Sequence, residues 1–199
     1  MKQLLALARR IDALNTRVGQ TAAWLILVAV LVSSINALTR YTLSIGSNAW
    51  LELQWYLFSG VFLLCSPWTL KANEHIRIDV VTGRFSPRVH AWIDIIGGVL
   101  FLIPMCVVIL WAGIPFATEA MATGEMSTNA GGLIVWPAKI LIPLGFTLLM
   151  AQGVSELIKR IAFLQGLIDG SEFEKAGHHG AVPDEAENAL AASTAHSTH

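Results

Sequence analysis

The side chains that could best take part in chemistry lie together in one short segment, which reads KANEHIRIDVV over residues 71 to 81. The chain is 54% hydrophobic and only 14% charged, yet it places here and directly afterwards Lys71, Glu74, His75, Arg77, Asp79 and Arg84. Basic side chains at a membrane surface bind anionic headgroups. The basic residues of this connector are therefore interpreted as membrane-surface anchors, which leaves the role of its Glu, His and Asp residues open.

Three further charges fall inside apolar segments. Glu52 and Lys139 lie near one end of their segments, and Asp94 lies near the opposite end of its own. An ion at the centre of a bilayer costs about 2.5 to 3.5 kcal/mol, so such residues usually form pairs or line a pathway. Two interpretations remain open, namely tethers for helix ends and a path for a substrate or ion. We expect Glu52 to pair with Lys139, and Asp94 to meet Arg77, Lys71 or Arg160.

The sequence gives little support for a catalytic, cofactor-binding or metal-binding site. The sequence contains no phosphate-binding Gly-rich loop, no HExxH motif and no nucleophile elbow. Cys65 and Cys106 lie in apolar segments, where a thiol behaves as a small hydrophobic group. The remaining histidines lack the spacing of a metal site and do not face each other within apolar helices, as haem ligands would; they are His90, His178, His179, His196 and His199. We expect no enzymatic activity, no cofactor or metal in this chain, and no nucleic-acid partner.

The elements that must position these residues are membrane helices. Among the 199 residues, apolar side chains collect in four blocks, at about 18–38, 50–70, 91–114 and 133–151. A bilayer core of about 30 Å needs about 20 helical residues, and a continuous apolar run satisfies its backbone hydrogen bonds only as a helix. The fold class is therefore an all-α integral membrane protein with four transmembrane helices, arranged as a bundle over residues 18–170. A cleaved signal peptide is the competing interpretation of the first block.

The basic residues indicate the orientation. Most of the 13 Lys and Arg residues fall in the N-terminal arm, the 71–88 connector or the segment after the fourth block. Basic residues near span ends favour the cytoplasmic side, so both termini are expected there, with the protein in the bacterial inner membrane. Arg40 and Lys139 fall toward the other side.

The two ends of the chain differ from its centre. Residues 1–17 place Leu4, Leu7, Ile11 and Leu14 on one helical face, which predicts an amphipathic helix lying along the membrane surface. The alternative is that this helix simply extends the first span. Residues 171–199 lose periodicity and become rich in small and acidic residues, which predicts a disordered acidic tail.

Several stretches together resemble a known family. The connector NEHIRIDVV after the second span, FSPRVHAWID leading into the third, and WPAKILIPLGFTLLMAQGVSELI in the fourth are similar to the small membrane subunit, of DctQ type, of tripartite ATP-independent periplasmic (TRAP) transporters. The resemblance covers about residues 18–165. The stretch GEMSTNAGGLIVWPAKILIPLGF is similar to a branch labelled mannitol/chloroaromatic, a label that does not identify the solute.

The resemblance implies a role rather than a reaction. In that family the small subunit joins a large permease subunit that contains the substrate and sodium sites, and a periplasmic protein delivers a carboxylate-bearing solute. This chain would then be a non-catalytic brace whose outer face helps dock the solute-binding protein. Glu74, His75, Arg77 and Asp79 would form local pairs or contact the large subunit. The alternatives are a membrane anchor for a redox or signalling complex and a small transporter that works as a homo-oligomer.

Overall fold

A computed structural model of the chain describes residues 1–43, 46–72 and 86–168. These residues form long helices joined by turns, and no β-strand occurs among them. The helices are α1 (Lys2–Leu43), α2 (Asn48–Ala72), α4 (Pro87–Gly97), the π-helix η1 (Gly98–Leu102), α5 (Ile103–Thr123) and α6 (Trp136–Leu164). The all-helical prediction is confirmed for this part of the chain.

Among the described residues, three stretches are long and apolar enough to cross a bilayer. They are Lys2–Leu43, the continuous run Pro87–Thr123 formed by α4, η1 and α5, and Trp136–Leu164. The 25-residue helix α2 is not among them, and polar side chains such as Glu52, Gln54 and Lys71 interrupt its hydrophobic residues. Its expected role as a fourth span therefore stays a prediction. Two helices extend past the predicted spans: α5 continues beyond residue 114 to Thr123, and α6 continues beyond residue 151 to Leu164.

The N-terminal segment is not a separate helix. Instead of an arm over residues 1–17 followed by a span, α1 runs without a break from Lys2 to Leu43. This continuity agrees with the alternative in which the helix extends the first span. Ala8 and Asn15 in its first half are buried, because this half packs on α6. The position of these turns relative to a membrane surface remains a prediction.

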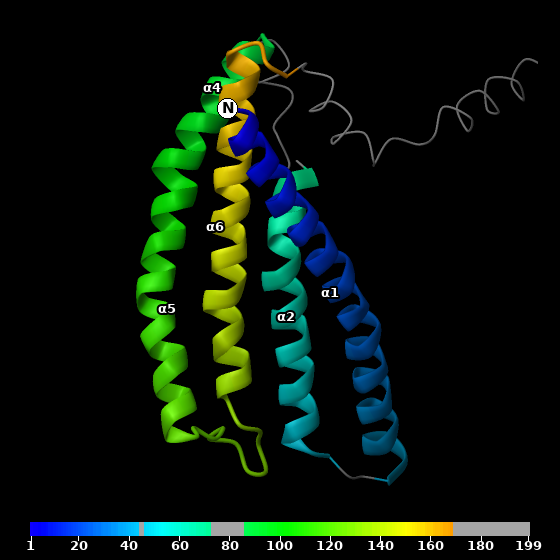
Figure 1. Cartoon of the computed structure of the whole chain (residues 1–199). Coiled ribbons are helices and arrows are strands. Elements are labelled where there is room, and N and C mark those ends of the chain that lie inside the picture. The colour runs from blue at the N-terminus through cyan, green and yellow to red at the C-terminus, as the bar shows by residue number, and fades with distance from the viewer. Residues whose placement is uncertain (44–45, 73–85, 169–199) are drawn as a thin grey trace, which may run out of the picture.

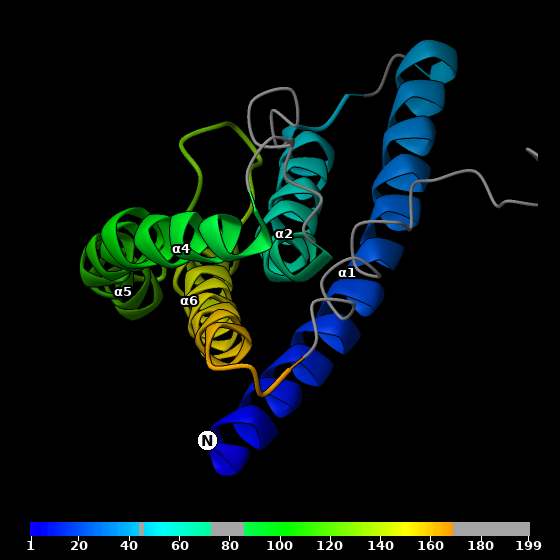
Figure 2. The same cartoon turned by 90° about the horizontal axis from the view of Figure 1, so that it is seen from above.

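The helices lie side by side in the order α5, α6, α2, α1 (Figure 1). Helix α6 also packs on α4 and on the first half of α1, and α1 crosses the others obliquely (Figure 2). The start of α1 and the end of α6 lie at one end of the molecule, together with the end of α2 and the start of α4. At the opposite end, a cavity of about 480 Å³ between α1 and α2 is lined by Asn36, Arg40 and Leu51, among others.

The interior is built from small residues, and large apolar side chains face outward. Ala8, Ala29, Ala91 and Ala162 are fully buried, whereas the side chains of Phe62, Phe101 and Trp111 are more than 70% exposed at 75%, 73% and 83%. Small residues at helix contacts with large apolar residues outside are typical of membrane helices. This arrangement fits a surface that lipid or another membrane subunit covers.

Glycine permits a close contact between α2 and α6. A Cβ atom on Gly145 of α6 would lie 2.9 Å from the carbonyl oxygen of Leu63 on α2. Any side chain there would therefore separate the two helices.

The π-helix has a local cause. Pro104 lacks an N–H group and cannot donate to the carbonyl four residues earlier, and the N–H of Ile103 instead donates to the carbonyl of Gly98, five residues back. The wider turn interrupts the regular helix between α4 and α5 without ending it.

Candidate functional site

The ionisable connector that dominates the sequence lies outside the described residues. Glu74, His75, Arg77, Asp79 and Arg84 are all among the residues of which no structure is described. Their assignment to local pairs or to a subunit contact therefore stays a prediction. Two polar clusters formed by the described residues lie at opposite ends of the helices.

The first cluster surrounds the connection between α5 and α6. Helix α5 ends at Gly124, whose φ of 62° is left-handed and favours glycine. The N–H of Ser127 then donates to the carbonyl of Leu133 at 2.9 Å, and the N–H of Val135 donates to the carbonyl of Glu125 at 2.9 Å. Residues 124–135 thus form a hairpin, which we call the outer hairpin, with its own backbone hydrogen bonds.

Glu52 of α2 holds this outer hairpin. Its Oε2 accepts a hydrogen bond from the N–H of Leu133 at 2.7 Å, and its Oε1 accepts from Asn129 Nδ2 at 2.8 Å and from the hydroxyl of Ser127. A Cβ atom on Gly132 would lie 2.8 Å from Oε1, so glycine leaves room for the carboxylate. One carboxylate on α2 therefore fixes three points of a turn about 80 residues later in the sequence.

Two other α2 side chains bind the same hairpin and its junction with α6. Asn48 donates to the carbonyl of Ala130 at 3.0 Å, and the hydroxyl of Tyr56 donates to the carbonyl of Ile134 at 3.2 Å. The first three turns of α2 thus attach the outer hairpin.

Lys139 has a different partner from the predicted one. Its ammonium group forms an ion pair with Glu125 and lies 3.9 Å from the centre of the Phe116 ring. Both contacts stabilise a cation whose side chain is only 14% exposed. The predicted Glu52–Lys139 pair is therefore wrong, because the outer hairpin supplies donors to Glu52 and a carboxylate to Lys139.

Asp94 is paired with one of its three predicted partners. Arg160 on α6 lies 3.1 Å from Asp94 Oδ2, and the Arg160 side chain is only 10% exposed. This ion pair joins α4 to α6 at the end of the molecule where the N-terminus lies (Figure 1).

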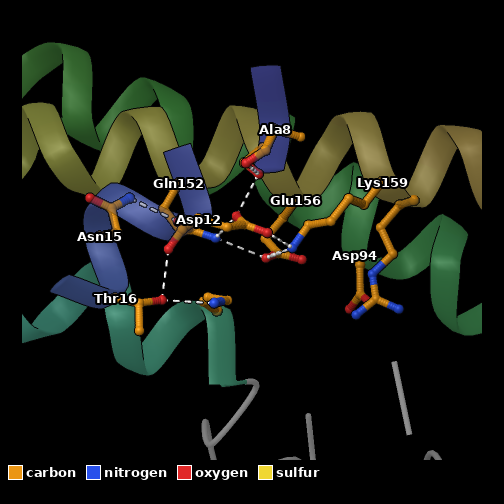
Figure 3. A network of polar contacts seen from close by, with 11 residues as sticks. Ala8, Asp12, Asn15, Thr16, Asp94, Gln152, Glu156 and Lys159 are labelled. Atoms are coloured by element: carbon orange, nitrogen blue, oxygen red, sulfur yellow. Dashed lines mark hydrogen bonds and ion pairs between the residues drawn. The ribbon is translucent and has the colours of Figure 1, made fainter. Parts of the chain in front are cut away.

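The second cluster, which we call the inner cluster, joins the first half of α1 to α6 (Figure 3). Asp12 Oδ1 accepts hydrogen bonds from Gln152 Nε2 at 2.8 Å and from Ser155 Oγ at 2.7 Å, and Lys159 lies 3.1 Å from Asp12 Oδ2. Gln152 and Lys159 also donate to Glu156 Oε1, at 3.0 Å and 2.5 Å. Two carboxylates thus share the donors of three α6 side chains.

Two carboxamides extend the inner cluster into the protein. Asn15 Nδ2 donates to Gln152 Oε1 at 2.8 Å, and both side chains are almost fully buried. The Gln152 amide nitrogen must face Asp12 and Glu156, so its oxygen must face Asn15. With the Gln152 amide in this orientation, the buried Asn15 Oδ1 has no partner among the described residues.

A third helix joins the inner cluster through α1. Lys71 in the last turn of α2 donates to Thr16 Oγ1 at 2.7 Å, and Thr16 Oγ1 donates to the carbonyl of Asp12 at 2.7 Å. Helices α1, α2 and α6 are thereby connected at one end of the molecule.

The sequence interpretation missed the inner cluster, although a signal was present. On α6, Gln152, Ser155, Glu156 and Lys159 follow one another at intervals of three, one and three residues, which places them on one helical face. On α1, Asp12 and Asn15 are three residues apart. A polar face within an otherwise apolar helix predicts a polar partner. The polar face of α1 and that of α6 could therefore have been predicted to contact each other.

The contacts of both clusters attach helices and turns to one another. Among residues 1–43, 46–72 and 86–168, no group of three or more His, Cys, Asp or Glu side chains is placed to hold a metal ion. The carboxylates of the two clusters, Glu52, Glu125, Asp12 and Glu156, accept hydrogen bonds or form ion pairs between helices and turns. Both clusters therefore stabilise the relative positions of helices.

Comparison with known proteins identifies the family. A family model described as "Tripartite ATP-independent periplasmic transporters, DctQ component" matches residues 29–163. Searches of curated proteins and of solved structures return no match. The matched region covers most of the chain, from the middle of α1 to the end of α6. The chain therefore belongs to the DctQ family, the small membrane subunits of TRAP transporters.

Proposed function

We propose that this chain is the non-catalytic brace of a TRAP transporter. One observation carries the proposal: the inner cluster and the outer hairpin tie helices together at opposite ends, and large apolar side chains face outward between them. A brace needs fixed helices and an apolar surface that a membrane partner can cover. A transport path instead needs broken helices and polar groups that converge at mid-membrane depth.

The proposed partners follow from the family. A large permease subunit would carry the solute and sodium sites and pack against the apolar surface of this chain. A periplasmic solute-binding protein would dock partly on the outer hairpin, which presents Met126 at 58% exposure. Because Glu52 fixes the hairpin at three points, a docking protein would meet a preformed surface. The transported solute would be an organic acid.

The proposed topology has four spans in the bacterial inner membrane, with α2 as the second span and both termini in the cytoplasm. The beginning of α1 and the end of α6 lie at one end of the molecule, which supports placing both termini on the same side. The basic residues of that end, Arg9, Arg10, Lys159 and Arg160, support the cytoplasmic assignment.

Reconstitution tests the proposal. Proteoliposomes that contain this chain and its large permease subunit, supplied with the solute-binding protein, should accumulate an organic acid when a sodium gradient is applied. Proteoliposomes that lack this chain should lose most of that uptake, and those that contain this chain alone should show none. Uptake by the chain alone would instead identify a small self-sufficient transporter. Visible haem absorbance, or purification with a dehydrogenase, would indicate a redox anchor.

A further inference from the structure

A polar cavity lies between α1 and α2 at the end of the molecule where the outer hairpin lies (Figure 1). Its volume is about 480 Å³, and a second cavity of about 230 Å³ shares part of its lining. Both cavities are lined by Asn36 and Arg40 of α1 and by Leu51 of α2. Ser33 of α1 and Gln54 of α2 add polar side chains to the larger one. The larger cavity therefore brings together one cation, two carboxamides and one hydroxyl.

The polar side chains of this cavity lack partners in the described protein. Asn36 is only 8% exposed, and its backbone carbonyl accepts a hydrogen bond from the hydroxyl of Thr39 at 3.0 Å. Its carboxamide, which lines both cavities, has no hydrogen-bond partner among the described residues. The same is true, in that part of the chain, of the Gln54 carboxamide and the Arg40 guanidinium. Because a buried polar group without a partner costs free energy, these donors indicate a ligand that accepts hydrogen bonds.

The cavity carries a positive charge. Arg40 lines both cavities, and no Asp or Glu lines either one among the described residues. Within residues 33–54 the sequence holds one other charge, Glu52, and both oxygens of its carboxylate accept hydrogen bonds from the outer hairpin. Residues 44 and 45 are a serine and an isoleucine, which add no charge. The end of α2 and the start of α4, which flank the ionisable connector, lie at the other end of the molecule. The charge of the cavity therefore favours an anion.

The donors lie at successive depths in the membrane. No charged residue occurs between Arg17 and Arg40, which are 23 positions apart on α1, a helical rise of about 35 Å. The hydrocarbon core of a bilayer is about 30 Å thick, so Arg40 lies at a membrane boundary. Asn36 and Ser33 precede Arg40 by four and seven residues on one face of α1, which places them about 6 Å and about 10 Å deeper.

A phospholipid presents its acceptors in the same order. Its phosphate lies at the membrane boundary, and its ester carbonyls lie directly below, towards the hydrocarbon core. An acidic side chain of a partner protein presents acceptors at one depth only. The vertical order of guanidinium and carboxamides in the cavity therefore favours a lipid over an acidic side chain.

We propose that this cavity binds an anionic phospholipid, such as phosphatidylglycerol, from the leaflet on the side of the outer hairpin. Arg40 donates to the phosphate, whose oxygens match the planar guanidinium. Asn36 and Gln54 donate to the ester carbonyls. The cation of a zwitterionic headgroup finds no carboxylate among the described lining residues. The inference does not depend on the transporter function.

Photolabelling in nanodiscs tests the proposal. A phosphatidylglycerol with a diazirine next to its ester group is added to phosphatidylcholine nanodiscs that hold the full chain, and labelled peptides are mapped by mass spectrometry. We expect residues 33–54 to be labelled about fivefold more than by a phosphatidylcholine that carries the same diazirine, because Arg40 favours the anionic headgroup. Equal labelling of these residues by the two lipids overturns the proposal.

Two variants and a matched control locate the contact. Arg40→Gln should reduce the labelling of residues 33–54 by phosphatidylglycerol about tenfold, because a hydrogen bond to a charged group is lost. Asn36→Leu should reduce it about threefold, because a neutral hydrogen bond in the membrane is lost. The control Ser34→Leu should be labelled as the wild type is, because the exposed Ser34 hydroxyl donates to the carbonyl of Val30 in the same helix. Circular dichroism verifies the helical content of each variant. Wild-type labelling of either folded cavity variant overturns the proposal.

Two further arms identify the source of the phosphate and the occupant of the cavity. Unlabelled phosphatidylglycerol in the nanodisc should reduce the labelling, and inorganic phosphate in solution should not. Reduction by inorganic phosphate would show that the site takes a free anion, which overturns the lipid assignment. In nanodiscs that hold the complete transporter, the labelling of residues 33–54 should persist. Its loss there would show that a partner subunit covers the cavity and would overturn the proposal.

Discussion

Replacing Gln152 with Leu tests whether the inner cluster stabilises the fold. Gln152 is fully buried and makes three hydrogen bonds, with Asn15, Asp12 and Glu156. Side-chain hydrogen bonds in membrane proteins contribute about 0.6 kcal/mol each on average, and a stranded buried polar group costs about 1 to 3 kcal/mol. Three lost bonds, and a buried Asn15 amide that keeps only its 3.4 Å contact with the carbonyl of Leu148, therefore predict a loss of about 3 to 5 kcal/mol in the free energy of unfolding.

The assay is reversible unfolding of the purified chain by sodium dodecyl sulfate in mixed micelles, followed by circular dichroism and tryptophan fluorescence. Thr147→Leu is the matched control, because Thr147 is exposed on the same helix and its hydroxyl donates only to the carbonyl of Pro143 in that helix. This control should change the unfolding free energy by less than about 0.5 kcal/mol.

A double variant isolates the amide pair. Asn15→Leu combined with Gln152→Leu should be less destabilising than the sum of the two single changes, by about 1 kcal/mol, because the double variant strands neither amide. If Gln152→Leu unfolds within about 0.5 kcal/mol of the wild type, the buried hydrogen bonds assigned to the inner cluster do not stabilise the protein.

Two other changes probe the outer hairpin and the helix contact. Glu52→Ala removes three hydrogen bonds, so limited proteolysis should cut residues 124–135 several-fold faster, whereas Glu119→Ala on the exposed surface of α5 should leave the cleavage rate unchanged; equal rates in both variants would contradict the role assigned to Glu52. Gly145→Ala should lower the unfolding free energy by about 1 to 3 kcal/mol, because the new methyl group meets the backbone of Leu63. Wild-type stability of that variant would show that α2 and α6 do not approach so closely.

The sequence predicted most of what depends on composition and helical periodicity. Long apolar runs leave a helix as the only structure that satisfies their backbone groups, so the helical class and the approximate positions of the helices followed directly. Ion pairs between residues far apart in the sequence were harder to predict. The pair of Asp94 and Arg160 was one of three alternatives, because residues at the same depth cannot be ranked without the helix order.

The missed contacts have a shared physical cause. Glu52 and Lys139 were matched by depth, but a hairpin with left-handed glycines and its own hydrogen bonds brings Ser127 and Glu125 nearer to them. Asp12 and Gln152 are 140 residues apart, and only the packing of α1 on α6 brings them together. The surface helix over residues 1–17 was predicted from its amphipathic spacing, and the same spacing occurs within the continuous helix α1.

The continuous α1 helix has a mechanical consequence. The inner cluster fixes it near Asn15, while Tyr41 at the other end is 91% exposed beside the cavity that separates α1 from α2. Tyr41 follows Asn15 by 26 positions, a helical rise of about 39 Å, so a tilt of about 5° at the fixed point displaces the far tip by about 3 Å. A partner that binds this tip therefore exerts a long lever on the packing of α1 against α2.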